Sequence, residues 1–578
     1  MEPAKAAGVD QRGSGGYLPG SDRLDLLNAE ILYGGLPLDP DRRRGDGGDL
    51  PVLCLRLVQL EVPGLQQAPR PRLRSEVLHR VRGSSSLKPA LTLLAIDQGT
   101  TGTRAILFDR SGRPVARAYR ELTQHFPKPG WVEHDPEEIW RSTLLVVRDA
   151  LAKARLRAAA LAAVGITNQR ETTILWDRRS GRPVHRAIVW QDRRTAELCR
   201  QMKSLEPYLQ RVTGLVLDPY FSGPKVAWLL RHDPAIARAA RQGRLAFGTV
   251  DSWLLWRLTG GKVHATDVTN ASRTLLLELK SSRWYSPILK AFGIPQSLLP
   301  EVLPSSGRFG VTAKVGPLPA GIPVTGIAGD QQAALFGQGC VEPGEAKNTY
   351  GTGCFLLMQT GTKPVLSSHG LIATAACGAD GRPAFALEGS VFIGGAAIQW
   401  LRDGLGLIRS AAETERIARS VADTGGVYMV PAFVGLGAPY WRPEARGLIC
   451  GLTRGTGRAH LVRAALEGIA YQSQELLQAM ERATGFKLRS LKVDGGAVKN
   501  NFLMKFQADL SGVPVIRPRI IETTALGAAQ LAGLGVGFWS VKDLARMRSA
   551  DRIFRPGWSA ARRRAAMAGW TSAIRRAL

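Results

Sequence analysis

Asp97 stands at the end of an apolar stretch, residues 93–96, and is followed by a Gly-Thr-Thr turn at residues 99–101. A second apolar stretch begins at residue 105. Glycine lets a backbone approach an anion closely, threonine hydroxyls and main-chain N–H groups donate to phosphate oxygens, and a strand-end carboxylate can hold Mg²⁺ through water. The pattern predicts a phosphate-binding hairpin with a metal-facing acid. An ordinary β-hairpin with a Gly-Thr turn is the alternative interpretation.

The same order of strand, turn and strand recurs at residues 346–358, where a Gly-Thr-Gly turn separates two predicted strands. A second copy of the hairpin indicates two similar lobes in one chain. A further Gly-rich turn at residues 491–501 would let a nucleotide base and ribose pass against bare backbone. In these features the sequence resembles the ATPase superfamily of actin and hexokinase. That resemblance implies an α/β fold of two duplicated, ribonuclease-H-like lobes with an ATP cleft between them.

A candidate acceptor site surrounds Asp330. This residue follows Gly329 at the end of an apolar strand predicted at residues 324–327, and a helix is predicted after it. The partial positive charge of a helix N-terminus favours an anion or a polar group, and a carboxylate beside it can accept a proton from a hydroxyl. Because Asp is also a favoured N-cap residue, a helix cap without chemistry is the alternative interpretation.

Four further segments carry a more specific resemblance. They are residues 127–136, residues 168–173, residues 220–229 and the region from 447 to 467. Each of the last two segments alone could be structural packing, but the ordered set excludes chance. From about residue 91 to its C-terminus the chain resembles the FGGY carbohydrate kinases, and most closely those members that phosphorylate glycerol.

This resemblance implies an acceptor site for the three hydroxyls of glycerol. The hydrogen-bonding residues would be Arg170, Glu171, Tyr220, Asp330 and Gln331, and the carbon side would be lined by Trp190 and Phe355. A site that pairs every hydroxyl strongly rejects analogues that lack one. Without the resemblance, Arg170 and Glu171 would be interpreted as an exposed ion pair. Tyr220 and Trp190 would be interpreted as core aromatic residues.

On the nucleotide side, the resemblance implies binding by Thr100, Thr101, Gly102, Arg104, Thr352, Gly395, Gln399, Gly496 and Asn500. Mg²⁺ would be held by Asp97, through water, and by Asp330. Gly102 departs from the family, whose glycerol-phosphorylating members commonly carry Ser at this position. A phosphate-facing hydroxyl is therefore expected to be missing. Since the backbone N–H remains, we expect a tuning effect and no loss of activity.

The activity implied by the resemblance is phosphorylation of glycerol to sn-glycerol 3-phosphate, with ATP and Mg²⁺ as cofactors and Asp330 as the catalytic proton acceptor. Two competing interpretations stay open. A kinase of the same family acting on another sugar or polyol would need a roomier acceptor wall than Arg170, Glu171, Trp190 and Phe355 provide. A non-catalytic actin-like filament or scaffold protein would keep the hairpins without needing an acceptor wall.

The composition narrows the choice of partners. The chain of 578 residues has 77 Lys and Arg against 48 Asp and Glu, a net charge of +29. The arginines are scattered singly among alanines and no nucleic-acid-binding motif accompanies them, so we expect no nucleic-acid partner. The six cysteines show no C-x-x-C spacing and no apolar run suggests a transmembrane segment, which together favour a cytoplasmic protein. The resemblance implies a homo-oligomer, dimer or tetramer.

The chain divides into three predicted parts. Residues 1–88 carry Pro, Gly and Arg clusters and are expected to be a disordered extension or the product of a translation start assigned too far upstream. Residues 91–340 would form the N-terminal lobe with the glycerol site and the first hairpin. Residues 341–578 would form the C-terminal lobe with the second hairpin and the adenosine site. The boundary is placed at a Pro-Gly break, residues 343–344.

Local signals predict particular elements within the lobes. Asp135 and Pro136 open a helix as N-cap and first residue, a buried strand covers residues 161–167, and Gly485 ends a long helix that begins near residue 460. Residues 523–532 form another helix, dense in small residues suited to tight packing. The stretch 311–320 lacks the Gly-Gly and Arg loop with which some bacterial relatives bind a sugar bisphosphate, which argues against that form of control.

Overall fold

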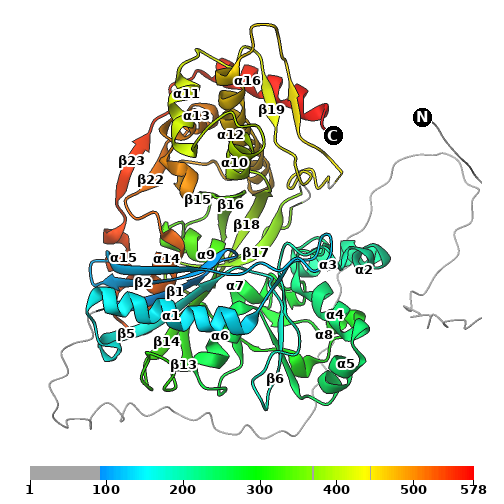
Figure 1. The fold of residues 1–578 in the computed structure, drawn as a ribbon, viewed down its shortest axis with the longest axis vertical. Coiled ribbons are helices and arrows are strands. Elements are labelled where there is room, and N and C mark those ends of the chain that lie inside the picture. Colours follow the sequence, from blue (N-terminus) through cyan, green and yellow to red (C-terminus); the bar gives the residue numbers. More distant parts are fainter. Residues whose placement is uncertain (1–91, 368–369, 443) are drawn as a thin grey trace, which may run out of the picture. The chain divides into compact units, whose positions relative to one another are not determined.

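The computed structural model describes residues 92–367, 370–442 and 444–578. The expectation for residues 1–88 therefore lies outside the described residues. Two large β-sheets with helices packed on them make up the described part (Figure 1). No helix in that part combines the length and the apolar content needed to cross a bilayer.

The first sheet has six strands in the order β13-β14-β5-β1-β2-β3. Its strands are β1 (Thr92–Gln98), β2 (Gly102–Asp109), β3 (Pro114–Glu121), β5 (Leu161–Asn168), β13 (Ser306–Val311) and β14 (Pro323–Gly329). β1, β2 and β3 form an antiparallel meander, while β5 pairs in parallel with β1 and β14 pairs in parallel with β5.

The second sheet has seven strands in the order β17-β18-β16-β15-β21-β22-β23. Its strands are β15 (Ala346–Tyr350), β16 (Cys354–Gly361), β17 (Ile372–Cys377), β18 (Pro383–Val391), β21 (Leu491–Asp494), β22 (Val515–Pro518) and β23 (Ala550–Phe554). Here β15, β16 and β18 form the antiparallel meander, and β21 and β22 continue the sheet in parallel from β15.

The two sheets therefore share a core of five strands, in which three antiparallel strands are followed by two parallel ones: β3-β2-β1-β5-β14 in the first sheet and β18-β16-β15-β21-β22 in the second. The second sheet adds β17, which lies between β16 and β18 in sequence and pairs with β18 at the edge. Short two-stranded pairs accompany them: β4 (Glu133–His134) with β7 (Ala187–Ile188), β6 (Ile174–Asp177) with β8 (Leu245–Gly248), β9 (Ala265–Asp267) with β12 (Glu301–Leu303), β10 (Leu277–Glu278) with β11 (Arg283–Trp284), and β19 (Tyr428–Val430) with β20 (Leu448–Cys450). The repeated topology confirms the predicted duplication of an α/β lobe.

Helices fill the connections between the strands. They are α1 (Pro136–Ala154), α2 (Ala196–Gln201), α3 (Glu206–Thr213), α4 (Ser222–His232), α5 (Pro234–Arg241), α6 (Val250–Leu258), α7 (Val268–Ala271), α8 (Ser286–Phe292), α9 (Asp330–Gly337), α10 (Gly395–Asp403), α11 (Thr414–Arg419), α12 (Arg458–Thr484), α13 (Asn501–Ser511), α14 (Thr523–Gly535), α15 (Val541–Met547) and α16 (Ala560–Arg575). Asp135 caps α1 by accepting from Glu137 N at 2.9 Å, and Gly485 ends α12 with φ +74°, both as predicted.

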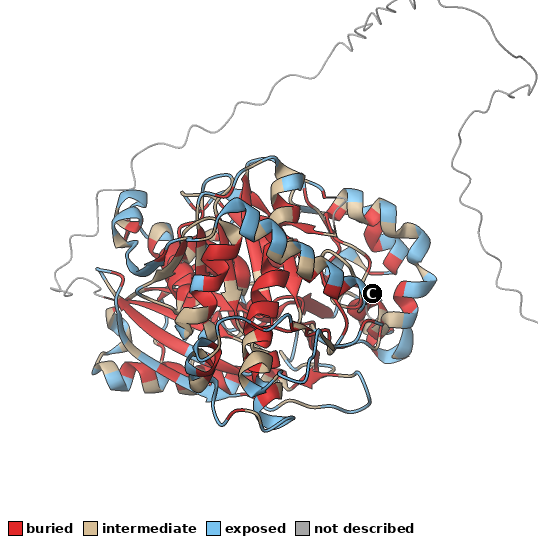
Figure 2. Cartoon of the chain, turned by 90° about the horizontal axis from the view of Figure 1, so that it is seen from above, coloured by how far each residue is buried: buried red, intermediate tan, exposed pale blue. Residues whose placement is uncertain are grey.

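Side chains that alternate along β1 bury the two faces of the first sheet against different helices. Leu94 and Ile96 pack in one cluster with residues of α1 and α6, whereas Leu93 and Ala95 pack in another with residues of α14. Because successive strand residues point to opposite faces, both sets are buried at once. Figure 2 shows the result as buried strands beneath helices whose outer faces are exposed.

The small residues of α14 allow the close packing that the sequence predicts. A Cβ at Gly527 would lie 1.9 Å from the Ala333 carbonyl oxygen of α9, and a Cβ at Gly326 would lie 2.3 Å from the Ala532 nitrogen. Neither position has room for a side chain. α14 thus follows six of the seven strands of the second sheet in sequence, since β23 alone comes after it, but it lies against the strands of the first sheet, with α9 beside it.

His264 is partly buried in the part of the first lobe built around β6 and β8. Its Nε2 lies 2.7 Å from the Phe247 carbonyl, so this nitrogen carries the proton, and Nδ1 accepts from Arg178 NH2 at 3.1 Å. A second proton would sit on Nδ1 and face the guanidinium. Burial lowers the pKa of His264 from 6.5 to about 4.

This environment predicts a loss of stability in mild acid. His264 of the unfolded chain takes up a proton below about pH 6.5, whereas His264 of the folded chain does so only below about pH 4. The stability that the neutral ring contributes above pH 6.5 is therefore lost progressively as the pH falls from 6.5 to 4. Between pH 7 and pH 5 the free energy of unfolding should fall by about 2 kcal/mol through this residue. Urea unfolding at both pH values measures it.

His264→Gln should shrink the difference between the two pH values even if it lowers stability at pH 7. His232→Gln, at the exposed end of α4, is the matched control and should leave the difference as it is. An unchanged pH difference in His264→Gln would contradict the assignment of the neutral tautomer.

Candidate active site

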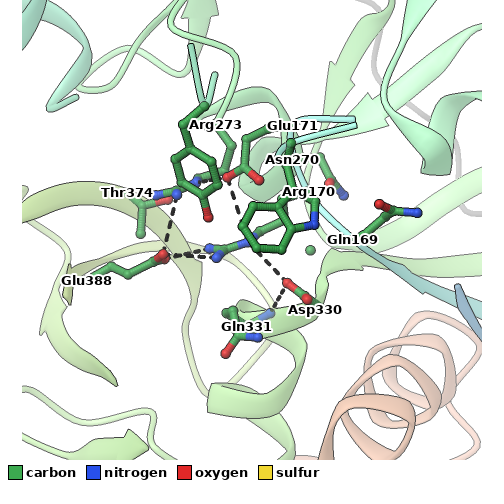
Figure 3. Close-up of polar contacts among 12 residues, drawn as sticks. Gln169, Arg170, Glu171, Asn270, Arg273, Asp330, Gln331, Thr374 and Glu388 are labelled. Atoms are coloured by element: carbon green, nitrogen blue, oxygen red, sulfur yellow. Dashed lines mark hydrogen bonds and ion pairs between the residues drawn. The ribbon is translucent and has the colours of Figure 1, made fainter. Parts of the chain in front are cut away.

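Arg170 lies two residues after the end of β5, in the middle of a buried cluster of charges. Its NH1 is 2.5 Å from Glu388 Oε2 and its NH2 is 2.9 Å from Glu388 Oε1, a two-pronged pair with a residue of β18. Its Nε is 3.1 Å from Asp330 Oδ1 at the start of α9 (Figure 3). One guanidinium thus connects residues of both sheets and of the helix that carries Asp330.

Glu171 faces a different partner from the one expected. Its Oε1 is 2.6 Å from Arg273 Nε but 3.9 Å from Arg170 Nε. The interpretation of Arg170 and Glu171 as an exposed pair is wrong, because both side chains are 2% exposed. Glu171 also has φ +61°, in the left-handed region that non-glycine residues rarely adopt. In this conformation its side chain reaches Arg273 and its carbonyl accepts from Ser222 Oγ at 3.0 Å.

The charges of the buried cluster balance, because it contains two cations, Arg170 and Arg273, and two carboxylates, Glu171 and Glu388. Burial alone would raise the pKa of Glu388, but the charges of the two arginines outweigh it and lower the pKa to about 2. Arg273 adds a contact of 3.3 Å from its NH2 to Glu388 Oε1. Sequence reasoning missed both Arg273 and Glu388. A Glu in the middle of an apolar strand, as at 388, is the signal that points to a buried charge.

Asp330 is the accessible member of the group. Its side chain is 30% exposed, while that of Arg170 is 2% exposed. Gly329 holds the N-cap position of α9, so Asp330 is the first helical residue and not the cap that the alternative interpretation required. A Cβ at Gly329 would lie 2.7 Å from Arg170 Cδ, so only glycine lets the arginine reach the carboxylate.

Gln331 is oriented by a lysine that the sequence did not suggest. Lys347 of β15 donates from its Nζ to Gln331 Oε1 and, at 2.7 Å, to Thr349 Oγ1. The Nε2 group of Gln331 therefore remains available to donate a hydrogen bond to a substrate. Lys347 is fully buried, and burial lowers its pKa.

The three aromatic residues expected around the acceptor lie together. The ring centroid of Trp190 is 5.6 Å from that of Tyr220 and 6.4 Å from that of Phe355, both in edge-to-face arrangements. Phe355 belongs to β16 and the other two to the first lobe, so residues of both lobes form this wall. Burial raises the pKa of the Tyr220 hydroxyl, which therefore stays protonated.

The first hairpin closes by a hydrogen bond from Gly99 N to Gly102 O at 2.9 Å. Trp190 Nε1 donates to Thr100 Oγ1 at 2.8 Å, which ties the hairpin to the aromatic wall. Arg104 NH1 lies 3.1 Å from Asp97 Oδ2, so the arginine expected to bind nucleotide is paired here with the expected metal-facing acid.

The second hairpin lies against the start of α10. Gly394 N donates to Thr352 O and Gly395 N to Gly351 O, both at 2.8 Å. A Cβ at Gly395 would lie 2.7 Å from the Gly351 oxygen, which leaves no room for a side chain. Thr352 and Gly395, both expected on the nucleotide side, thus lie close together.

The other residues expected on the nucleotide side, Gln399 together with Gly496 and Asn500 near the base, differ in their surroundings. Gly496 has open space where a Cβ would stand. Gln399 is exposed on α10. The Asn500 amide is engaged, because Oδ1 caps α13 by accepting from Leu503 N at 3.0 Å and Nδ2 donates to Thr414 Oγ1 at 3.0 Å. Asn500 thus holds the turn, and a direct contact with a base would use what remains of its hydrogen-bonding capacity.

The carboxylates fit the way proteins bind Mg²⁺. Among the residues described, no group of three or more His, Cys, Asp or Glu could hold a metal by itself. Mg²⁺ commonly keeps several waters and uses one or two carboxylates plus substrate phosphates. Asp97 and Asp330 are near enough that the charge of Asp330 helps to raise the pKa of Asp97, although burial is the larger cause. A cation between phosphates and these two acids suits that donor set.

The duplicated sheets with their hairpins define an actin- and hexokinase-like fold. Residues 92–337 match the N-terminal domain and residues 346–536 the C-terminal domain of the FGGY family of carbohydrate kinases. The chain belongs to this family. It is 59% identical over 487 residues to a glycerol kinase of Shewanella sp. (strain ANA-3), covering 84% of this chain and 98% of the relative. A glycerol kinase of Symbiobacterium thermophilum is 58% identical over 488 residues, with the same coverage.

Solved structures agree with this assignment. The crystal structure of Plasmodium falciparum glycerol kinase with ADP is similar with a TM-score of 0.79 and 38% identity, covering 84% of this chain and 98% of that one. A xylulose kinase from Lactobacillus acidophilus has a TM-score of 0.74 at 21% identity, with 84% and 97% covered, and shows the fold alone.

The buried pair predicts a large effect of neutralising one partner. Glu388→Gln would remove the carboxylate that Arg170 and Arg273 share, and would leave the two buried cations with too little negative charge around them. This change should lower the free energy of unfolding, measured in urea, by about 3–5 kcal/mol. Arg402→Gln, which breaks the exposed pair with Asp403, is the control and should leave the midpoint unchanged. Equal midpoints for Glu388→Gln and the parent would mean that the cluster does not stabilise the fold.

A side chain at position 102 was expected to face the phosphate, but in this structure it would point into β3. A Cβ there would lie 2.4 Å from the Arg120 carbonyl and 2.6 Å from the Tyr119 ring, both in β3. The space is filled by Tyr119, whose hydroxyl donates to Thr101 O at 3.3 Å and whose ring lies 5.3 Å from the Arg104 guanidinium carbon. In this chain no side chain fits at 102, so a Ser could not simply supply a phosphate-facing hydroxyl.

Gly102→Ser should therefore weaken the fold. We expect the free energy of unfolding to fall by about 1–3 kcal/mol, the range for overpacking a filled site. Gly307→Ala in β13, where a Cβ meets only Pro304 O at 3.9 Å, is the matched control. Differential scanning calorimetry compares the two variants. A Gly102→Ser protein as stable as the control would show that β3 can move to accommodate the side chain without loss of stability.

Proposed function

We propose that this protein transfers the γ-phosphoryl group of ATP to a terminal hydroxyl of glycerol and releases sn-glycerol 3-phosphate. The observation that carries the proposal is the placement of Asp330, a partly exposed carboxylate held by the otherwise buried Arg170. The identity of 59% to a curated glycerol kinase over nearly all of its length supports the choice of substrate.

The acceptor hydroxyl would be positioned before it reacts. Asp330 would accept its proton as the oxygen attacks phosphorus. Arg170 Nε fixes one carboxylate oxygen at 3.1 Å, which sets the direction of the other. Gln331 Nε2, free because Lys347 engages the Oε1 atom, would donate to a hydroxyl oxygen. The aromatic rings would lie along the carbon side of the triol and exclude water.

The nucleotide phosphates would lie against the two hairpins. The chemistry supplied by Mg²⁺ in such sites is neutralisation of charge on the transferred phosphoryl group. Asp97 and Asp330 are the residues proposed to hold it. Thr100, Thr101 and Thr352 would bring hydroxyl and backbone N–H donors to the phosphates, while Gly395 and Gly496 would let the nucleotide approach bare backbone.

The proposed function also implies a cellular location and an oligomeric state. We assign it to the cytoplasm and expect a homo-oligomer, dimer or tetramer, measurable by light scattering coupled to gel filtration. The five cysteines Cys199, Cys340, Cys354, Cys377 and Cys450 are free in the described part of the chain, as in reducing compartments. No specific observation favours either competing interpretation, a family kinase acting on another sugar or polyol or a non-catalytic actin-like filament or scaffold protein.

Asp330→Asn tests the catalytic assignment. Asparagine keeps the shape and can still accept from Arg170, but it cannot take up a proton, so kcat should fall by about 10²–10⁴ while the KM values for glycerol and ATP change little. A coupled assay of ADP release measures both. Asp380→Asn, at an exposed loop, is the matched control.

A panel of polyols and sugars in the same assay tests the substrate. Glycerol should give the highest kcat/KM. If the parent preferred a pentulose, the glycerol assignment would be wrong, and if Asp330→Asn turned over like the control, another group would be the proton acceptor.

A further inference from the structure

His134 lies beneath the first hairpin, fully buried, at the end of β4. Its Nε2 is 3.0 Å from Gln124 Oε1 and its Nδ1 is 3.3 Å from Gln169 Nε2. Gln124 precedes β4 and Gln169 follows β5, immediately before Arg170. The imidazole therefore bridges two amides that belong to different parts of the first lobe.

The direction of every hydrogen bond in this bridge can be assigned. Gln124 Nε2 donates to the Thr100 carbonyl at 2.7 Å and to the Leu122 carbonyl at 3.3 Å, so Gln124 Oε1 must accept from His134 Nε2. In the neutral ring Nδ1 is then an acceptor, which is what the Gln169 amide nitrogen requires.

Gln169 is fixed by further bonds of its own. Its Oε1 accepts from Thr172 Oγ1 at 2.9 Å and its Nε2 also donates to Gln98 Oε1 at 3.1 Å. Gln98 Nε2 in turn donates to the Gly99 carbonyl at 2.8 Å. The carbonyls of Gly99 and Thr100, both in the hairpin, are thus each held by a glutamine amide.

The hydrogen bonds to the Gly99 and Thr100 carbonyls set the direction of the backbone N–H groups that follow them in the hairpin. In a trans peptide the C=O and the following N–H point in opposite directions. With the Gly99 and Thr100 carbonyls held by the two amides, the N–H groups of Thr100 and Thr101 face away from them. Neither N–H donates to any residue that the structure describes. Two consecutive, unused backbone donors near Asp97 are the kind of group from which an anion-binding nest is built.

We propose that His134 is a positioning residue for nucleotide phosphate, acting through Gln124 to aim the Thr101 N–H at the phosphate. The inference rests on the proposed function for the presence of ATP at this hairpin. The Gln124 link should be the sensitive one, because Gln169 has other partners and the Thr100 carbonyl has only Gln124 among the described side chains. The loss should therefore fall on the nucleotide and not on glycerol.

Gln124→Glu is the sharpest test, because it is isosteric and can still accept from His134 but presents oxygen to the Thr100 carbonyl. We expect the Kd for ADP, measured by calorimetry, and the KM for ATP to rise at least tenfold, with the KM for glycerol changed less than threefold. His134→Leu should do the same, and the two changes combined should cost no more than either alone. His134→Gln, whose amide can donate where Nε2 does, should recover most of the affinity.

Gln210→Glu is the matched control, since that amide also donates to a backbone carbonyl, of Ser367, but on α3. It should bind ADP like the parent. An ADP Kd within twofold of the parent for Gln124→Glu, or an equal rise in the KM for glycerol, would overturn the inference. A parent that binds ADP but does not phosphorylate glycerol would instead contradict the proposed function, and the ADP measurement would still decide the role of His134.

Discussion

The salt bridge between Arg170 and Glu388 is the interaction on which the rest of the site depends. Both groups are almost fully buried, so each charge needs the other, and removal of one would leave several kcal/mol of uncompensated desolvation. Because Arg170 follows β5 and Glu388 lies in β18, the requirement acts between the two sheets. Arg273 and Glu171 complete the balance of charge, and Asp330 is left as the carboxylate that still meets solvent.

Much of this arrangement could be predicted from the sequence. The hairpins, the helix that begins at Pro136, the strand beginning at Leu161 and the helix ended by Gly485 each follow from local signals, since caps, glycines and apolar periodicity act over a few residues. The duplication could be predicted because the same Gly-Thr turn occurs twice. The aromatic wall of Trp190, Tyr220 and Phe355 was expected only through the family resemblance.

The partners of the charged residues could not be predicted in the same way. Arg170 and Glu171 are neighbours in sequence, yet each pairs with a residue more than a hundred positions away. Backbone geometry explains this, because Glu171 adopts φ +61° and the two side chains leave the chain in different directions. The roles of Lys347, Gln124 and His134 are likewise set by tertiary contacts, and no spacing rule brings an imidazole beneath a hairpin.

A ribosome that has completed the first lobe has not yet made the helix that covers it. α14, residues 523–535, buries Leu93, Ala95, Ile106 and Phe108 of the first strands, and it is synthesised after almost all of the second sheet. Until then, one face of the first sheet lacks its cover and presents apolar side chains to water. Closing so long a loop makes folding slow and leaves that face open to aggregation or to chaperones. Residues 92–337, although they match one family domain, are therefore not expected to fold as a separate fragment.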